Sequence, residues 1–184
     1  MALALTLNAW SKGEFGWFWV WMGSSGATAW LAILAMGVIA VRVGMGLRAA
    51  SSEKSTKGVE HLLRRAGSTL LAGSIAVAIS DPLVSRVIKP MIASPRPCQI
   101  GVTDVPSPLV CGSGFAMPSA HASNAAAVAG ALMSPPLAVV AAVVGVGRVV
   151  DGLHWPGDVV AGWVLGGAIG VMVRRRTDDL FKTA

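Results

Sequence analysis

The chain has 184 residues, of which 54% are hydrophobic and only 13% are charged, whereas soluble domains carry about 25% charged residues. With a mean hydropathy of +0.65, a chain of this length is expected to be one membrane domain, 1–184, which excludes most soluble enzymes. The net charge of +6 comes with few charges and no tyrosine, so we expect no nucleic-acid partner.

The first 23 residues are expected to lie at the membrane interface. Their apolar start gives way to Lys12 and Glu14, and tryptophans follow between Trp17 and Trp21. Tryptophan favours the headgroup level of a bilayer. A secretory signal peptide would begin with a basic leader, which this segment lacks. The pattern therefore predicts a retained interfacial segment over 1–23.

Five apolar stretches follow that approach the roughly 17 to 25 residues of a membrane span. They lie at 24–41, 66–87, 119–134, 137–151 and 156–173. The third and the fourth stretches are short. This pattern predicts an all-α fold, a polytopic transmembrane helical bundle.

Basic residues predict the orientation of this bundle. Lysine and arginine are concentrated in 42–65 and in the cluster 174–176, and such segments stay in the cytoplasm. The amino terminus is then outside, and 174–184 is a cytoplasmic tail. The same topology makes 89–118 a long extracytoplasmic loop.

Cys98 and Cys111 both lie in this outer loop. In an oxidising compartment such a pair is expected to form a disulfide, which would stabilise the loop by roughly 2 to 4 kcal/mol. The alternative is two free buried thiols. Structural zinc usually takes four ligands, so these two cysteines do not predict a metal site.

Polar residues that are costly beside hydrocarbon gather at the same outer face. Ionisable groups in such positions tend to pair, line a cavity or do chemistry. Arginine matches phosphate oxygens with a planar fork, and lysine adds a point charge, so the set indicates a phosphate site. Its members are Lys89, Arg96, Ser119, His121, Arg148, His154 and Asp158.

Helix geometry predicts how some of these residues act. Ser119 is expected to cap the helix that begins at Ala120, whose first amides can bind an anion. On a continuous helix Arg148 and His154 would lie about 240° apart, so a break is required, which Gly152 and Pro156 supply.

His154 and Asp158 are four residues apart, within reach of each other. Asp158 can accept from one imidazole nitrogen and leave the other free to attack. The pair predicts a nucleophile with its orienting carboxylate.

These residues resemble the motifs of the type 2 phosphatidic acid phosphatase superfamily, in its membrane lipid phosphatase branch. The motifs have the forms K-x6-R-P, P-S-G-H and S-R-x5-H-x3-D, and the match spans 89–158 in the correct order. The fitting residues are Lys89, Arg96 and Pro97, then Pro118, Ser119 and His121, then Arg148, His154 and Asp158.

The resemblance implies a mechanism without metal or cofactor. His154 would form a phosphohistidine, Asp158 would support it, and His121 would protonate the leaving oxygen before water hydrolyses the intermediate. The family often has six spans, so five or six are expected here. The residues implied to bind the phosphoryl group are Lys89, Arg96, Ser119 and Arg148, and the helix geometry above adds the amide of Ala120.

The chain departs from the motifs at two positions. Ala120 replaces a glycine, which keeps the N–H donor but loses the freedom to take a positive φ. Gly147 replaces a serine and removes a hydroxyl. We expect altered phosphate contacts with the reaction retained.

The expected function is a lipid phosphate or diphosphate phosphatase of a bacterial inner membrane, with its site facing the periplasm or the outside. Undecaprenyl diphosphate is the favoured substrate, because the cysteines that follow Arg96 and precede Pro118 resemble those of bacterial prenyl diphosphate phosphatases. Phosphatidic acid, phosphatidylglycerol phosphate and lipid A 1-phosphate are alternatives. A lipid phosphotransferase would share the covalent intermediate.

Two further alternatives are not enzymes. A small transporter would distribute its polar groups over the membrane depth or in two repeats, whereas this chain has one outer cluster. A phospholipid-binding protein without turnover is the other alternative, which the two departures leave open. The sequence does not predict the oligomeric state.

Three other features have structural interpretations. Asp81 with Pro82 indicates a helix kink rather than a catalytic acid. Asp151 is either a buried ion-pair partner of Arg148 or part of the site. The glycines at 162, 166 and 170 recur at helical spacing, which indicates close helix packing.

Overall fold

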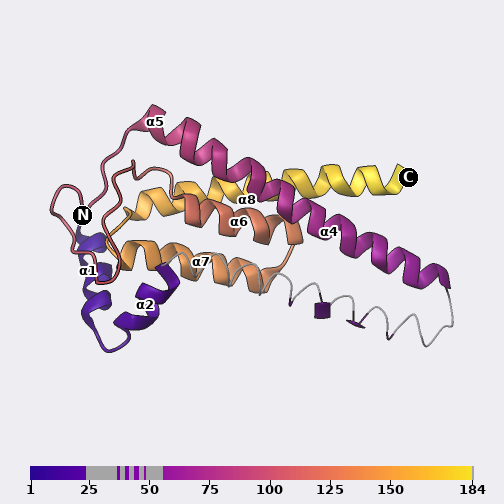
Figure 1. The fold of residues 1–184 in the computed structure, drawn as a ribbon, viewed down its shortest axis with the longest axis horizontal. Helices are drawn as coiled ribbons and strands as arrows, with labels where there is room; N and C mark the ends of the chain where they lie inside the picture. Colours follow the sequence, from indigo (N-terminus) through magenta and orange to yellow (C-terminus); the bar gives the residue numbers. More distant parts are fainter. Residues whose placement is uncertain (24–36, 38–39, 42–43, 46–47, 49–55, 184) are drawn as a thin grey trace.

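The computed structural model describes residues 1–23, 37, 40–41, 44–45, 48 and 56–183. Within these ranges the structure contains helices and no strand, in agreement with the expected all-α fold (Figure 1). The predicted span 24–41 lies almost entirely outside the described residues. The number of spans therefore stays a prediction.

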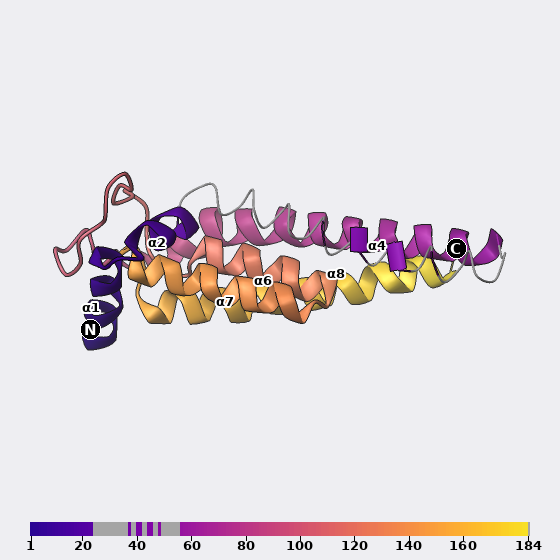
Figure 2. The same cartoon turned by 90° about the horizontal axis from the view of Figure 1, so that it is seen from below.

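Four of the described helices form an elongated bundle (Figures 1 and 2). They are α4 (Thr56–Pro82), α6 (Ala120–Leu132), α7 (Pro135–Val150) and α8 (Pro156–Thr183). The short helix α6 contacts the other three and packs most extensively on α8. Its buried side chains are mainly alanines, which let the neighbouring backbones approach closely.

The helices α6, α7 and α8 contain most of the apolar stretches expected at 119–134, 137–151 and 156–173. Helix α8 continues to Thr183, so the expected tail from 174 is helical for most of its length. Arg174 contributes to this extension, because it donates to Asp178 at 2.9 Å and to Thr69 of α4 at 2.7 Å.

Two stretches in the described part of the chain are long and apolar enough to cross a membrane. Arg64–Ile92 has 29 residues and Pro156–Leu180 has 25. At 1.5 Å per residue they are roughly 38 to 44 Å long, which exceeds the ~30 Å of a hydrocarbon core. Pro135–Val150 is apolar but shorter.

Helix α4 changes form at Pro82. A π-helical segment, η2 (Leu83–Ile88), follows this proline and leads directly into the short helix α5 (Lys89–Ile92). Such segments are wider than α-helix and recur at functional sites. The expected kink is thus a π-helical stretch. Its wider turns change the side of the helix on which Lys89 lies.

The N-terminal segment folds over the end of the bundle where α7 finishes and α8 begins (Figures 1 and 2). It comprises α1 (Ala2–Ala9), η1 (Trp10–Lys12) and α2 (Gly16–Gly23). The buried Asn8 donates to Val150 O at 2.8 Å and to Asp104 O at 2.9 Å. One side chain therefore joins the N-terminal segment to both the outer loop and the end of α7.

The loop predicted at 89–118 keeps the name outer loop below, although its side of the membrane stays a prediction. It begins later than expected, because residues up to Ile92 are helical and irregular chain starts at Ala93. A disulfide joins Cys98 to Cys111, whose Cα atoms lie 6.0 Å apart. The alternative of two free thiols is therefore wrong.

The repeated glycines of α8 lie against α6, as their spacing predicts. A Cβ atom added at Gly162, Gly166 or Gly170 would meet backbone carbonyls at the N-cap of α6 or within it, those of Ser119, Ser123 and Ala127 respectively. Backbone cannot move aside as the end of a side chain can. These glycines therefore set the close approach of the two helices.

Gly166→Ala is expected to destabilise the bundle by about 1 to 3 kcal/mol, because overpacking forces the backbones apart. Gly167→Ala is the matched control, since a Cβ at Gly167 meets nothing within 4 Å and alanine favours a helix by up to about 1 kcal/mol. Thermal unfolding of both variants in detergent, followed by circular dichroism, measures the difference. Equal unfolding midpoints would contradict the packing role.

Candidate active site

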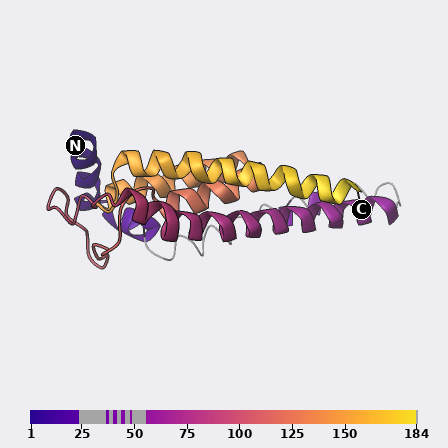
Figure 3. The ribbon, with the colours of Figure 1, turned by 90° about the horizontal axis from the view of Figure 1, so that it is seen from above.

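Five segments of the chain meet at one end of the bundle (Figure 3). They are α5, the outer loop, the start of α6, the end of α7 and the turn before α8. The charges of Lys89, Arg96, Arg148 and His154 all act on His121, so the three sequence motifs lie together. His121 itself is half-buried at the second position of α6.

The turn before α8 brings His154 back to Arg148. Helix α7 ends at Val150, and Gly152 takes φ +72°, a left-handed conformation that glycine adopts without strain. A Cβ there would meet Asp104 O and the Asn8 amide. The N–H of His154 then donates to Arg148 O at 3.2 Å, so the helix break that the sequence requires is present.

The imidazole of His154 lies between an arginine and a carboxylate. Its Nε2 is 3.2 Å from Arg96 Nη1, and its Nδ1 is 3.4 Å from Asp158 Oδ2. A guanidinium is only a donor, so Nε2 is the acceptor and we assign the ring proton to Nδ1. This tautomer turns the Nε2 lone pair away from Asp158 and towards the arginine.

Asp158 is held in turn by the backbone. Its Oδ2 accepts from the N–H of Trp155 at 2.8 Å, and its carbonyl oxygen accepts from the N–H of Ser119 at 2.9 Å. The carboxylate is buried at the start of α8. Asp158 therefore connects the nucleophile candidate to the beginning of α6.

His154 is only 2% exposed. This burial lowers the pKa of its imidazole well below the ordinary value, and the positive charges of Arg96 and Arg148 lower it further. The ring is therefore neutral at neutral pH, the form in which a lone pair is available.

Backbone carbonyls of the outer loop and of the turn before α8 hold Lys89 and Arg96. Lys89 Nζ donates to Phe115 O at 2.9 Å. Arg96 donates through Nε to Gly114 O at 2.8 Å and through Nη1 to Leu153 O at 3.0 Å. Burial lowers the pKa of Arg96, and the charge of Asp158 opposes this effect. Arginine nevertheless stays protonated in proteins, so the positive charge remains beside His154.

Ser119 lies at the N-cap position of α6 but does not cap it, since its side chain makes no capping hydrogen bond. The expectation of a serine cap is wrong in this respect. The hydroxyl oxygen is buried and has no hydrogen-bond partner among the described residues. It can thus donate to an anion at the start of α6.

A comparison with known protein families gives a match. A model of the PAP2 superfamily matches residues 68–182, more than half of the chain. The chain belongs to the PAP2 superfamily. This confirms the resemblance to type 2 phosphatidic acid phosphatases and the expected phosphatase class.

A solved structure to which this PAP2 chain is similar is the crystal structure of a transmembrane PAP2-type phosphatidylglycerolphosphate phosphatase from Bacillus subtilis. The two chains are 20% identical, with a TM-score of 0.46 over 97% of this chain and 94% of that chain. No curated protein matches the chain.

The two departures from the PAP2 motifs occupy different environments. Ala120 begins α6 and does not have a positive φ, which among described non-glycine residues occurs at Ala93 and Met133. The conformational freedom of a glycine is therefore not needed at 120. Gly147 is buried in the last turn of α7, where its carbonyl accepts from the N–H of Asp151.

Asp151 is fully buried beside the site. Neither carboxyl oxygen has a hydrogen-bond partner among the described residues. The charge of Arg148 acts on this carboxyl group. Whether Asp151 is an ion-pair partner of Arg148 or part of the site stays a prediction.

Sequence reasoning missed two groups that position the site. The amide of Trp155 holds Asp158, and no side-chain pattern predicts a backbone donor. Asn8 holds the end of α7 through Val150 O, and the signal available was an amide side chain in a mainly apolar segment.

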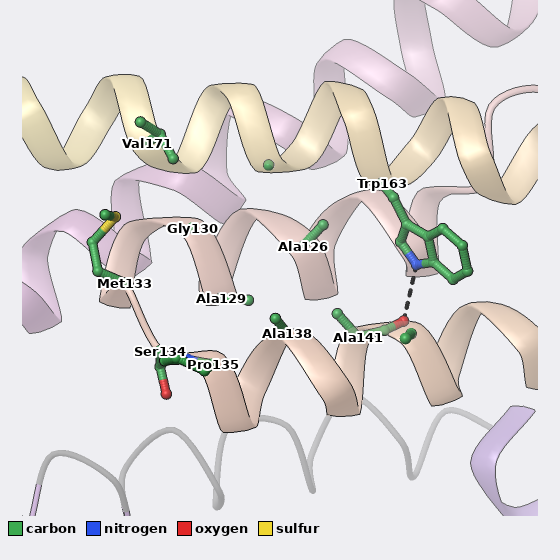
Figure 4. Close-up of a pocket in the computed structure, with 12 residues that line it drawn as sticks. Ala126, Ala129, Gly130, Met133, Ser134, Pro135, Ala138, Ala141, Trp163 and Val171 are labelled. Carbon is green, nitrogen blue, oxygen red and sulfur yellow. Dashed lines mark hydrogen bonds between the residues drawn. The ribbon is translucent and has the colours of Figure 1, made fainter.

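An apolar cavity lies on another face of this PAP2 bundle, between α6, α7 and α8 (Figure 4). Its volume is about 490 Å³, and Ala126, Gly130 and Trp163 are among its lining residues. Gly130 is nine residues after His121, about 180° around α6. The Trp163 indole N–H is bonded to Ala141 O at 3.0 Å. This cavity therefore has no charge for a phosphate and faces away from His121.

Proposed function

We propose that this chain is a metal-independent lipid phosphate phosphatase whose nucleophile is Nε2 of His154. The arrangement of Arg96, His154 and Asp158 carries the proposal, because one buried imidazole is neutral, oriented by a carboxylate and adjacent to a cation. A histidine with only a structural role would not need to combine these three properties.

In the first step the Nε2 lone pair attacks phosphorus. The N–P bond forms while the bond between phosphorus and the lipid oxygen breaks, and that oxygen takes the bonding electron pair and a proton from His121. Asp158 stabilises the positive charge that develops on the ring. The lipid alcohol leaves, and His154 carries the phosphoryl group.

In the second step water attacks the same phosphorus. His121 takes a proton from the water, the N–P bond breaks, and its electron pair returns to Nε2. Inorganic phosphate and free enzyme result. A lipid hydroxyl in place of water would give the phosphotransferase alternative.

The phosphoryl oxygens would be bound by four side chains and the first amides of α6, including that of Ala120. Charge-assisted donors of this kind stabilise the charge of the transition state. Arg96 would exchange its contact with Nε2 for a phosphoryl oxygen when the substrate binds. The four side chains that would bind the phosphoryl oxygens are Lys89, Arg96, Ser119 and Arg148.

The disulfide between Cys98 and Cys111 supports a site on the oxidising side of a membrane, the periplasm or the outside of a bacterial inner membrane. Two substrate classes follow from the sequence: undecaprenyl diphosphate, and the glycerolipid phosphates such as phosphatidic acid. The preference for undecaprenyl diphosphate stays a prediction.

The purified chain in detergent is expected to release inorganic phosphate from these lipids with a divalent-metal chelator present. A histidine nucleophile with arginine and lysine ligands needs no metal charge to bind the phosphoryl group. Phosphate release is measured over a panel of undecaprenyl diphosphate, phosphatidic acid and phosphatidylglycerol phosphate. Activity that disappears with the chelator and returns with magnesium would contradict the proposed mechanism.

A further inference from the structure

A carboxylate and an amide meet between α4 and α6, outside the three PAP2 motifs. Asn124 donates from Nδ2 to Asp81 Oδ1 at 2.8 Å. Asp81 belongs to the apolar stretch Arg64–Ile92, yet its side chain is exposed on the bundle surface. A carboxylate at such a position is costly and usually has a function.

Helix packing does not account for this pair. The adjacent Ser80 and Ser123 already join α4 to α6 through a buried hydrogen bond of 2.9 Å. Asp81 adds an exposed charge beside a contact that is complete without it. The interpretation of Asp81 with Pro82 as a helix kink explains only the backbone at Pro82. It does not explain the carboxylate of Asp81.

The pair lies about one turn of α6 beyond the proposed site. Asn124 follows His121 by three residues on α6, which puts the two on one face and about 4.5 Å apart along the helix axis. The charge of Asp81 also acts on Lys89. Asn124 is thus the next polar side chain that a ligand extending from His121 along α6 would meet.

The proposed mechanism indicates which part of the substrate lies beside His121. His121 protonates the leaving oxygen, so the lipid atoms bonded to that oxygen lie beside it. In a glycerolipid those atoms carry ester or hydroxyl oxygens within a few bonds of the scissile oxygen. In a polyprenyl phosphate they are hydrocarbon.

We infer that Asp81 and Asn124 form a glycerol-recognising subsite, which makes this enzyme select glycerolipid phosphates over polyprenyl phosphates. The second Nδ2 hydrogen of Asn124 donates to an ester carbonyl of the glycerolipid, and Asp81 holds the amide in place for this contact through the hydrogen bond that it accepts. A hydrocarbon chain would leave this amide hydrogen without an acceptor, which disfavours a polyprenyl substrate. The inference rests on the proposed function and reverses the substrate preference drawn from the cysteines.

The test compares two lipids with the same scissile group, phosphatidic acid and undecaprenyl phosphate, in mixed detergent micelles. The wild-type kcat/KM is expected to favour phosphatidic acid by about 10- to 100-fold, the value of one or two hydrogen bonds to a charged or amide group. Asn124→Leu is expected to reduce this ratio by about 10-fold, through a loss on phosphatidic acid alone.

Two further variants separate recognition from folding. Asp81→Asn preserves side-chain volume at an exposed position and is expected to reduce the same ratio. Ser123→Ala removes the neighbouring interhelical hydrogen bond and is expected to leave the ratio unchanged. A purely structural role of the pair would lower activity on both lipids equally.

The possible results of this experiment test the subsite and the proposed function separately. Hydrolysis of both lipids with a ratio that no Asp81 or Asn124 variant changes would overturn the subsite alone. A wild-type preference for undecaprenyl phosphate would overturn it as well. Release of phosphate from neither lipid, nor from the wider panel, would overturn the proposed function.

Discussion

Replacement of His154 by alanine is expected to lower the rate of phosphate release by at least about 10⁴-fold, as the loss of a catalytic nucleophile does in other enzymes with covalent intermediates. The variant keeps Lys89, Arg96 and Arg148, so binding of the lipid phosphate should persist. The loss should therefore appear in kcat much more than in KM.

A trapping experiment identifies the nucleophile directly. Wild-type enzyme mixed rapidly with lipid carrying a radioactive phosphate and quenched in alkali should retain label on His154, since a phosphorus–nitrogen bond survives base. His154→Ala should retain none. His121→Ala is the matched histidine control: it should work slowly, because the leaving oxygen lacks its acid, and still carry label on His154.

Undiminished phosphate release by His154→Ala would refute the assignment. Label found on another residue would refute it equally. Both results would leave the membership in the PAP2 superfamily intact, because that membership does not depend on the role of one side chain.

Hydropathy predicted the helices near the site well because apolar length and proline define their ends. Pro135 and Pro156 begin α7 and α8, at positions where a missing N–H costs nothing. The end of α8 was not predicted, since 174–176 ends an apolar run without ending the helix. Arginines there are stabilised by partners such as Asp178, four residues later.

The motifs predicted which residues would be neighbours but not how their atoms meet. Spacing alone brought Asp158 within reach of His154. The contact between Arg96 and Nε2 joins positions 58 apart and depends on the path of the outer loop. The ring tautomer follows from that contact, so it was not accessible from the sequence.

Predictions from local sequence preferences were wrong where tertiary contacts determine the hydrogen bonds of a residue. Ser119 has the residue type of a helix cap, yet its hydroxyl makes no capping bond. Its backbone N–H is bound by Asp158 O, which fixes the chain direction there. The same serine is therefore better described as a buried donor of the site than as a cap.

Variants of Asp158 are expected to separate its effect on the orientation of the His154 ring from the effect of its negative charge. Asp158→Ala should lower kcat by about 10³- to 10⁴-fold, because Nδ1 of His154 and the N–H of Trp155 both lose their acceptor. Asp158→Asn should cost only about 10- to 100-fold. One oxygen, Oδ2, accepts from both groups, so an amide oxygen in its place keeps the tautomer and loses only the negative charge.

Steady-state kcat and KM on phosphatidic acid measure both effects, with Asp104→Asn as the control. The carboxylate of Asp104 pairs with Lys12 at 2.6 Å on the exposed surface of the outer loop, where such a pair contributes little. This variant should keep wild-type kinetics. Equal losses in Asp158→Asn and Asp158→Ala would mean that charge alone matters, and no loss in either would remove Asp158 from the mechanism.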